Sequence, residues 1–232
     1  MRPLKRKVVM RKVVMHKIVM HKIVMGRALM PKVLIPRVLI LLICLPLLLV
    51  SGCSATISLP AQVAEPREVQ LLLHGRHSSI LLTAADQSRL RYSFGDWAWY
   101  VANEQSLASG SRALFLDSKG ALGRQQIATA STGENLEAQI GVGISQRWQF
   151  QVEAAKVDAL IETLEQQFQH SQIAPFYSPE RHLSFIPSDR PYTMHYNSNH
   201  QAADWLRALG LKVEGNPVWG NWQVKNAEPT QR

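Results

Sequence analysis

The sequence predicts an α+β domain in which a mainly antiparallel sheet packs against two main helices. Three observations lead to this fold class. Short β-rich segments parted by turn residues follow one another from residue 69 to residue 94, as in a meander. Two later segments, 153–169 and 198–209, carry apolar residues at helical spacing. Because these strands and helices do not alternate one by one, a parallel α/β sheet is disfavoured.

The strands are predicted from composition, alternation and flanking turn residues. A looser stretch over 109–134 separates the first group of strands from the rest, and a turn is expected over 187–191. The predicted strands are, in chain order, 69–73, 79–83, 90–94, a short 113–116, 148–152, 182–186, a short 192–195 and 219–224.

The two helices are predicted from their apolar spacing and their end signals. In 153–169, apolar residues recur from Val157 to Phe168 and make one continuous stripe. The second helix begins after Asn197, a favourable N-cap, and stops at Gly210. Each apolar stripe is expected to lie against the sheet.

A short apolar segment precedes the domain. Residues 38–50 are uncharged and follow a basic leader. A helix of that length covers about 20 Å at roughly 1.5 Å per residue, less than the roughly 30 Å of a bilayer core, and Pro46 interrupts it. The segment is therefore typical of the apolar part of a secretory signal, not of a membrane span.

The residues that follow this segment, Val50-Ser51-Gly52-Cys53, resemble the cleavage box of bacterial lipoprotein signals. The resemblance implies that 1–52 is a signal peptide and that Cys53 becomes the lipidated first residue, which anchors the chain to a membrane. Ser54 after this Cys, in place of Asp, resembles lipoproteins of the Gram-negative outer membrane that face the periplasm. Residues 53–66 would then form a tether, 67–228 a single domain and 229–232 a tail.

The extreme N-terminus is a five-residue repeat that begins RKVVM, RKVVM, HKIVM, HKIVM. A period of five matches neither a helix nor a strand. Two interpretations stay open, namely a basic arm on a membrane surface and an expanded repeat upstream of the true start. A start at Met30 would leave a leader of 23 residues before Cys53, within the roughly 15–30 residues usual for a signal.

Charge and cysteine content exclude several classes of function. Residues 1–52 hold 11 of the 26 Lys and Arg residues and none of the 17 acidic ones, so the remainder has 15 basic against 17 acidic residues, a formal charge of −2. The basic character belongs to the leader, and no nucleic acid partner is expected. Cys44 and Cys53 both lie at or before the cut, so the domain has no disulfide and no cysteine nucleophile. No cofactor is expected either.

Two segments could carry chemistry. His77 lies just before an apolar strand, and Ser198 lies in the first turn of the second helix, where N–H groups and the helix dipole favour negative charge. A nucleophile at a helix N-terminus facing a strand histidine is a recurring hydrolase arrangement. Ser198 is therefore the candidate nucleophile, His77 the base and Asp96 the group that orients the base. Backbone N–H groups of Ser198 and Asn199 would form the oxyanion site.

Each candidate also has a structural interpretation. Ser198 suits a helix start, His77 a strand end, and Asp96 a turn in which its side chain bonds to the backbone. No metal site is expected, because the histidines of these segments lack a standard zinc-ligand spacing. These histidines are His74, His77, His195 and His200.

Three stretches resemble an uncharacterised bacterial family known as a domain of unknown function. They are Gly75-Arg76-His77-Ser78-Ser79-Ile80, the pair Gly95-Asp96, and Asn197-Ser198-Asn199 with the helix that follows. That family has a Gly-x-His strand, then a Gly-Asp, then a Cys-Asn helix start, in an order similar to circularly permuted papain-like proteins. The resemblance covers about residues 69–224 and implies a permuted papain-like fold.

The family's cysteine position is occupied by Ser198, and the glycine of its strand motif by Ser79. A helix N-terminus and a histidine can draw a thiol to thiolate, whereas a serine hydroxyl stays protonated and needs its base in the transition state. Two functions follow. One is a non-catalytic envelope lipoprotein that binds a cell-wall or lipid ligand or serves a structural role. The other is a serine hydrolase or acyltransferase acting on amides or esters of peptidoglycan peptides or lipids; the change from Cys to Ser favours the first.

Overall fold

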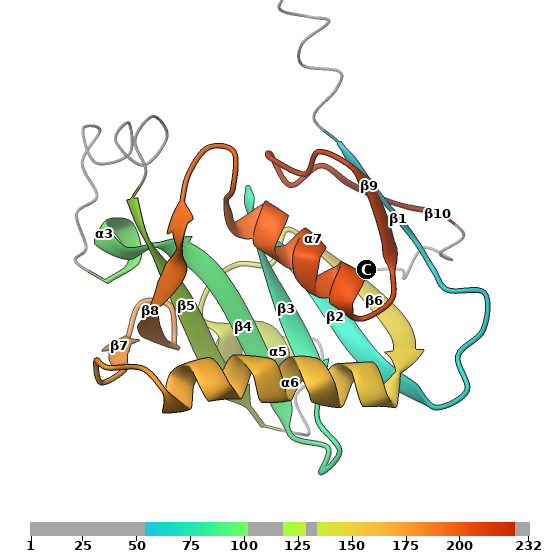
Figure 1. Cartoon of the computed structure of the whole chain (residues 1–232), viewed down its shortest axis with the longest axis horizontal. Helices are drawn as coiled ribbons and strands as arrows, with labels where there is room; N and C mark the ends of the chain where they lie inside the picture. Colours follow the sequence, from blue (N-terminus) through green and yellow to red (C-terminus); the bar gives the residue numbers. More distant parts are fainter. Residues whose placement is uncertain (1–53, 102–117, 129–133, 226–232) are drawn as a thin grey trace, which may run out of the picture. The chain divides into compact units, whose positions relative to one another are not determined.

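The computed structural model describes residues 54–101, 118–128 and 134–225, which form an α+β fold with mainly antiparallel sheets (Figure 1). The predicted fold class is confirmed at this level. The signal peptide, Cys53, the strand expected at 113–116 and the tail at 229–232 lie outside the described residues. Within the described ranges, none of the helices combines the length and the apolar character that a membrane crossing needs.

The larger sheet has seven strands, and every neighbouring pair in it is antiparallel. Its order is β6-β2-β3-β4-β5-β8-β7. The strands are β2 (Pro66–His74), β3 (His77–Thr83), β4 (Arg89–Asp96), β5 (Ser118–Ile127), β6 (Gln146–Glu153), β7 (Phe176–Ser178) and β8 (Leu183–Tyr192).

Strands β2, β3 and β4 form the predicted meander. Gly75 has a φ of +65° in the two-residue turn between β2 and β3, a conformation that glycine adopts without steric cost. Side chains alternate between the two faces of the sheet: Leu71 joins the main core, and Leu72 joins a smaller cluster on the other side. The central strands are therefore buried on both faces.

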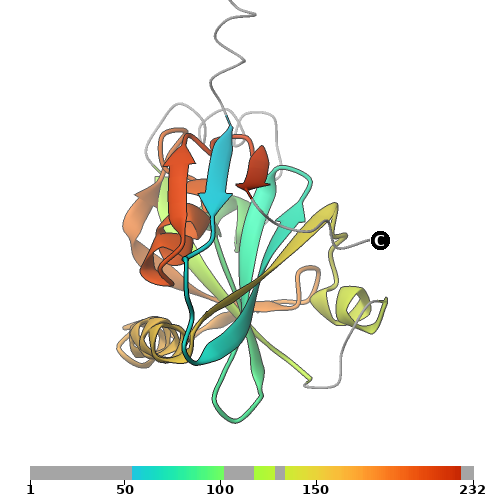
Figure 2. The ribbon, with the colours of Figure 1, turned by 90° about the vertical axis from the view of Figure 1, so that its right-hand side faces the viewer.

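Four helices are described: α3 (Trp97–Tyr100), α5 (Glu134–Ile140), α6 (Ala154–Gln169) and α7 (Ser198–Ala208). Figure 2 shows α6 and α7 on one face of the seven-stranded sheet and α5 on the opposite face. Val157 of α6 and Leu206 of α7 are fully buried in the main core, which confirms both predicted apolar stripes. Gly210, with a φ of +88°, follows the end of α7 as predicted.

A second sheet has three strands, β1 (Ala55–Ser58), β9 (Lys212–Gly215) and β10 (Trp222–Lys225), in the order β10-β1-β9. The prediction of a tether over 53–66 is therefore wrong at its start. Ala55 and Ile57 are fully buried, and β1 is held between two C-terminal strands. A four-residue strand whose partners lie far along the chain carries too little local pattern to be recognised.

A turn is expected over 187–191, but β8 includes Pro187 and Pro191, and its pairing with β5 is irregular between Ser188 and Tyr192. β7 pairs with β8 only as far as Phe185, so beyond that point β8 is an edge strand among the strands that the structure describes. An edge strand tolerates the missing N–H of a proline. The residues from Ser118 onward, predicted as loop, form the long β5 between β4 and β8.

Candidate active site

The structure brings His77 and Ser198 together, as the sequence predicts. His77 opens β3, and Ser198 opens α7, which crosses β3 near that end of the sheet (Figure 1). The His77 Nδ1 atom lies 3.3 Å from the Ser198 Oγ atom. This is hydrogen-bond distance between a candidate base and a candidate nucleophile.

The two side chains differ in their access to solvent. His77 is exposed, whereas only 1% of Ser198 is exposed. The phenol oxygen of Tyr192, at the end of β8, lies against both the backbone N–H and the hydroxyl of Ser198. Solvent therefore reaches the histidine but not the serine.

The N–H groups at the start of α7 already have partners. The Asn197 side-chain oxygen accepts from the N–H of Asn199 at 3.0 Å and from that of His200 at 3.4 Å. The N–H of Ser198 faces the Tyr192 hydroxyl. Of the two donors predicted for an oxyanion, the Asn199 N–H is thus used to cap the helix, and the Ser198 N–H is directed at Tyr192.

Asp96 is placed near the pair but does not serve as its third member. Its Oδ1 atom accepts from the N–H of Trp99 at 2.7 Å, which caps α3, and its Oδ2 atom accepts from the Ser118 hydroxyl. Among the described residues, the structure gives no hydrogen bond between Asp96 and His77. The structural interpretation of Asp96, a side chain bonded to the nearby backbone, describes it better than the orienting role.

Electrostatics around His77 favour its neutral form. Although part of the His77 side chain is exposed, desolvation of its ring lowers the pKa of His77 below its usual value, and the positive charge of Arg181 lowers it further. The imidazole stands edge-on to the Tyr100 ring, with 6.2 Å between centroids, and Arg181 lies over the same ring. A neutral imidazole is the form that a general base requires.

Asn199 holds the segments around the site. Its Oδ1 atom accepts from the Ser78 hydroxyl at 2.7 Å, and its Nδ2 atom donates to the Arg76 carbonyl at 2.9 Å and the Val218 carbonyl at 3.1 Å. The Trp222 indole N–H also donates to Ser78, at 2.9 Å. The side chain of Asn199 therefore ties α7 to the β2–β3 turn and to the loop before β10.

His74 belongs to a separate polar network with Gly143, Ser79 and Arg91. Its Nδ1 atom lies 2.9 Å from the Gly143 carbonyl, which can only accept, so Nδ1 carries the proton. Its Nε2 atom then accepts from the Ser79 hydroxyl at 2.8 Å, and Ser79 accepts from Arg91 Nε at 3.2 Å. Burial, followed by the charge of Arg91, lowers the pKa of His74 to about 4.

Arg91 is the charged centre of that network. It is 2% exposed, and its Nη1 atom donates to the Gln125 side chain at 3.1 Å and to the Ile140 carbonyl at 3.2 Å. Burial lowers the pKa of Arg91 to about 10, so the guanidinium remains charged near neutral pH. Burial of the His74 ring, together with this neighbouring cation, explains why His74 resists protonation.

The four histidines noted in the sequence do not assemble into a metal site. His74 bonds to Gly143 and Ser79, while His200 bonds to Asn197 and Asn216. In the part of the chain that the structure describes, no three His, Cys, Asp or Glu side chains gather as metal ligands would.

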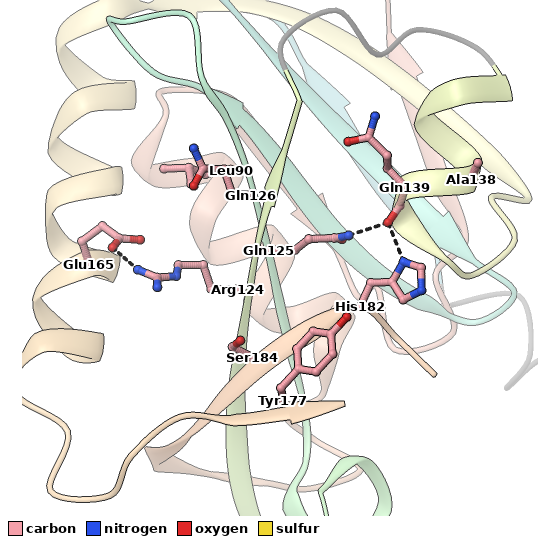
Figure 3. Close-up of a pocket in the computed structure, with 10 residues that line it drawn as sticks. All are labelled: Leu90, Arg124, Gln125, Gln126, Ala138, Gln139, Glu165, Tyr177, His182 and Ser184. Atoms are coloured by element: carbon pink, nitrogen blue, oxygen red, sulfur yellow. Dashed lines mark hydrogen bonds and ion pairs between the residues drawn. The ribbon is translucent and has the colours of Figure 1, made fainter. Parts of the chain in front are cut away.

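A groove of about 810 Å³ lies along the C-terminal part of β5, where Arg124, Gln125 and Gln126 line it (Figure 3). The polar groups on its wall bond to one another. Arg124 pairs with Glu165, and the Gln139 carbonyl accepts from the Gln125 side chain and lies 2.9 Å from His182 Nδ1. None of the residues predicted for the site lines this groove.

Sequence reasoning missed Tyr192, whose phenol lies beside Ser198. Tyr192 was expected to begin a short strand, and no spacing relates it to Ser198 or His77. The contact depends on the pairing of Tyr192 with Ser118 at the start of β5, which only the folded sheet provides. The local pattern offers no signal for it.

No protein-family model matches the chain, and neither a curated protein nor a solved structure matches it.

Proposed function

We propose that the chain is a cell-envelope lipoprotein whose domain is a degenerate, papain-like module without catalytic activity, which binds a cell-wall or lipid ligand or serves a structural role. The order of a strand histidine followed by a helix-borne Ser198 supports the papain-like interpretation. The box at Cys53 supports the lipid anchor, and the Ser54 that follows it supports an outer-membrane location facing the periplasm.

One observation carries the non-catalytic assignment. Ser198 is only 1% exposed, and the next N–H groups are taken by Asn197. A serine hydrolase needs donors that stay open for the oxyanion of its transition state. Here the same donors stabilise the helix start in the resting protein.

A second function is favoured by a different observation, the 3.3 Å between His77 Nδ1 and Ser198 Oγ. With the lowered pKa of His77, this geometry fits a hydrolase or acyltransferase acting on an amide or ester. Such an enzyme would have to make Ser198, now 1% exposed, accessible to its substrate.

A fluorophosphonate probe separates the two functions. We expect the wild-type protein to remain unlabelled under conditions that label a control serine hydrolase, because Ser198 is 1% exposed and its neighbouring donors are occupied. Gel fluorescence or intact mass measures the adduct. Labelling of wild type that disappears in Ser198→Ala would establish the enzyme instead.

Ser198→Cys tests the same site with a thiol. The mature chain has no other free thiol if Cys53 is acylated, so alkylation by iodoacetamide reports position 198 alone. We expect it to react more slowly than Ser88→Cys in the β3–β4 turn, because the new thiol is buried against Tyr192. Faster reaction at position 198 than at position 88 would indicate an activated nucleophile and contradict the non-catalytic proposal.

Cys53→Ala tests the lipid anchor. We expect this substitution to block cleavage at the lipoprotein box, so that the uncleaved precursor accumulates. Intact mass of the membrane fraction distinguishes the acylated mature chain from the precursor, with Ser54→Ala as the variant that keeps the cysteine. Normal maturation of Cys53→Ala would overturn the assignment.

A further inference from the structure

The chain between the proposed lipid anchor and the folded domain is a single residue, Ser54. The Ser54 carbonyl accepts from the N–H of Asn216 at 3.0 Å, and the N–H of Ala55 donates to the Asn221 carbonyl at 2.9 Å. Two residues span at most about 7 Å when extended. An acyl group on Cys53 would thus be attached directly beside the loop that precedes β10.

That attachment point lies at the same end of the domain as the candidate site. Ala55 pairs with Trp222, whose indole N–H reaches Ser78, the residue after His77. The loop beside Ser54 is held to the start of α7, because the side chain of Asn197 donates to the Val218 carbonyl at 2.9 Å. In Figure 1 the start of β1, the start of α7 and the turn between β2 and β3 all lie toward the top of the view.

The surface at this end combines exposed cations with half-buried aromatic rings. Three cations lie over rings there, and each belongs to a segment that ends or begins at this edge of the sheets. Side chains of this kind are suited to the headgroup layer, where the rings stay partly apolar and the cations meet phosphate. The pairs are Arg76 over Trp219 at 5.2 Å, Lys119 over Trp97 at 4.9 Å, and Arg190 over Tyr196 at 3.6 Å.

We propose that this end, the anchor face defined by those six residues, lies against the phospholipid headgroups of the membrane that holds the lipid anchor. The proposal rests on the proposed acylation of Cys53. The rigid connection through Ser54 fixes which end of the domain meets the bilayer. Arg76 and Lys119 supply attraction to anionic headgroups, whereas Arg190 is paired with Asp204 at 3.2 Å. Lipid, rather than a peptide of the cell wall, is then the nearest neighbour of His77.

The experiment uses the full acylated protein in vesicles of phosphatidylethanolamine and phosphatidylglycerol that contain a doxyl-labelled lipid. Because the mature chain has no free cysteine, Arg76→Cys and Asp86→Cys each take one environment-sensitive fluorophore. The two positions occupy the turns at opposite ends of β3. We expect about threefold or more stronger quenching at position 76, since headgroup contact places a label within roughly 10 Å of the acyl boundary.

A second pair, Lys119→Cys near the start of β5 and Ser88→Cys in the β3–β4 turn, repeats the comparison in case one variant fails to fold. Equal quenching at the two ends, or stronger quenching at positions 86 and 88, would overturn the anchor face. Intact mass and flotation of the same samples report acylation. A chain that is acylated and floats but shows no difference overturns this inference and leaves the lipoprotein assignment intact, whereas an unacylated chain overturns both.

Discussion

Asn199→Asp is expected to lower the free energy of unfolding by about 3–5 kcal/mol at pH 7. Asn199 is 1% exposed, and its Nδ2 atom donates to the carbonyl oxygens of Arg76 and Val218. Aspartate has nearly the same shape, but it places an acceptor where those two donated bonds are made. A buried negative charge would then face two carbonyl oxygens without a compensating cation.

Urea unfolding followed by tryptophan fluorescence measures this loss. Asn135→Asp, an exposed position of α5, makes the same chemical change and is expected to shift stability by no more than about 0.5 kcal/mol. Burial should raise the folded-state pKa of the new carboxyl above its unfolded value of about 3.9, so the loss should grow as pH rises above that value. A loss no larger than that of Asn135→Asp would contradict the role assigned to Asn199.

The sequence motifs that suggested an enzyme have structural roles in the folded chain. A Cβ atom on Gly95 would lie 2.4 Å from the Tyr100 ring, so the glycine allows this ring to pack on the sheet. Asp96 then caps the short helix that carries Tyr100. Asn197 caps α7, and Asn199 joins three segments. These contacts explain the residue types at those positions without any substrate.

The parts of the fold that could be predicted are those whose pattern is local. The strands of the β2–β3–β4 meander have apolar residues bounded by turn signals, and α6 and α7 have apolar stripes with end signals. These signals depend on neighbours within a few residues. They do not depend on how distant segments pair.

The parts that could not be predicted depend on distant pairing. β1 is stabilised by strands more than 150 residues away in the chain. β8 keeps two prolines because, among the described strands, none pairs with its outer edge beyond Phe185. The same limit applies to the site. The sequence predicts that His77 approaches Ser198, because one residue begins a strand and the other begins a helix. It does not predict that Tyr192 lies beside Ser198 or that Asp96 bonds to Ser118, because both depend on the order of β4, β5 and β8 in the sheet.

Acid is expected to destabilise the protein through His74, with a loss of roughly 2–3 kcal/mol as pH falls from about 6.5 to about 4. The folded state lowers the pKa of His74 to about 4, because the ring is buried and Arg91 lies beside it, whereas the unfolded chain has the ordinary value of 6.5. The unfolded state therefore binds the proton first. Stability is greatest above pH 6.5 and decreases until the folded histidine also protonates.

The pH dependence of urea unfolding in wild type and His74→Gln measures this contribution, because carboxylates that titrate in the same range are common to both proteins. We expect the acid loss to be smaller in His74→Gln, which has no imidazole at this position to take up the proton. His195→Gln, in the exposed turn before α7, removes one imidazole outside the Arg91 network and is expected to retain the wild-type acid loss. An undiminished loss in His74→Gln would show that the network around Arg91 does not hold His74 neutral.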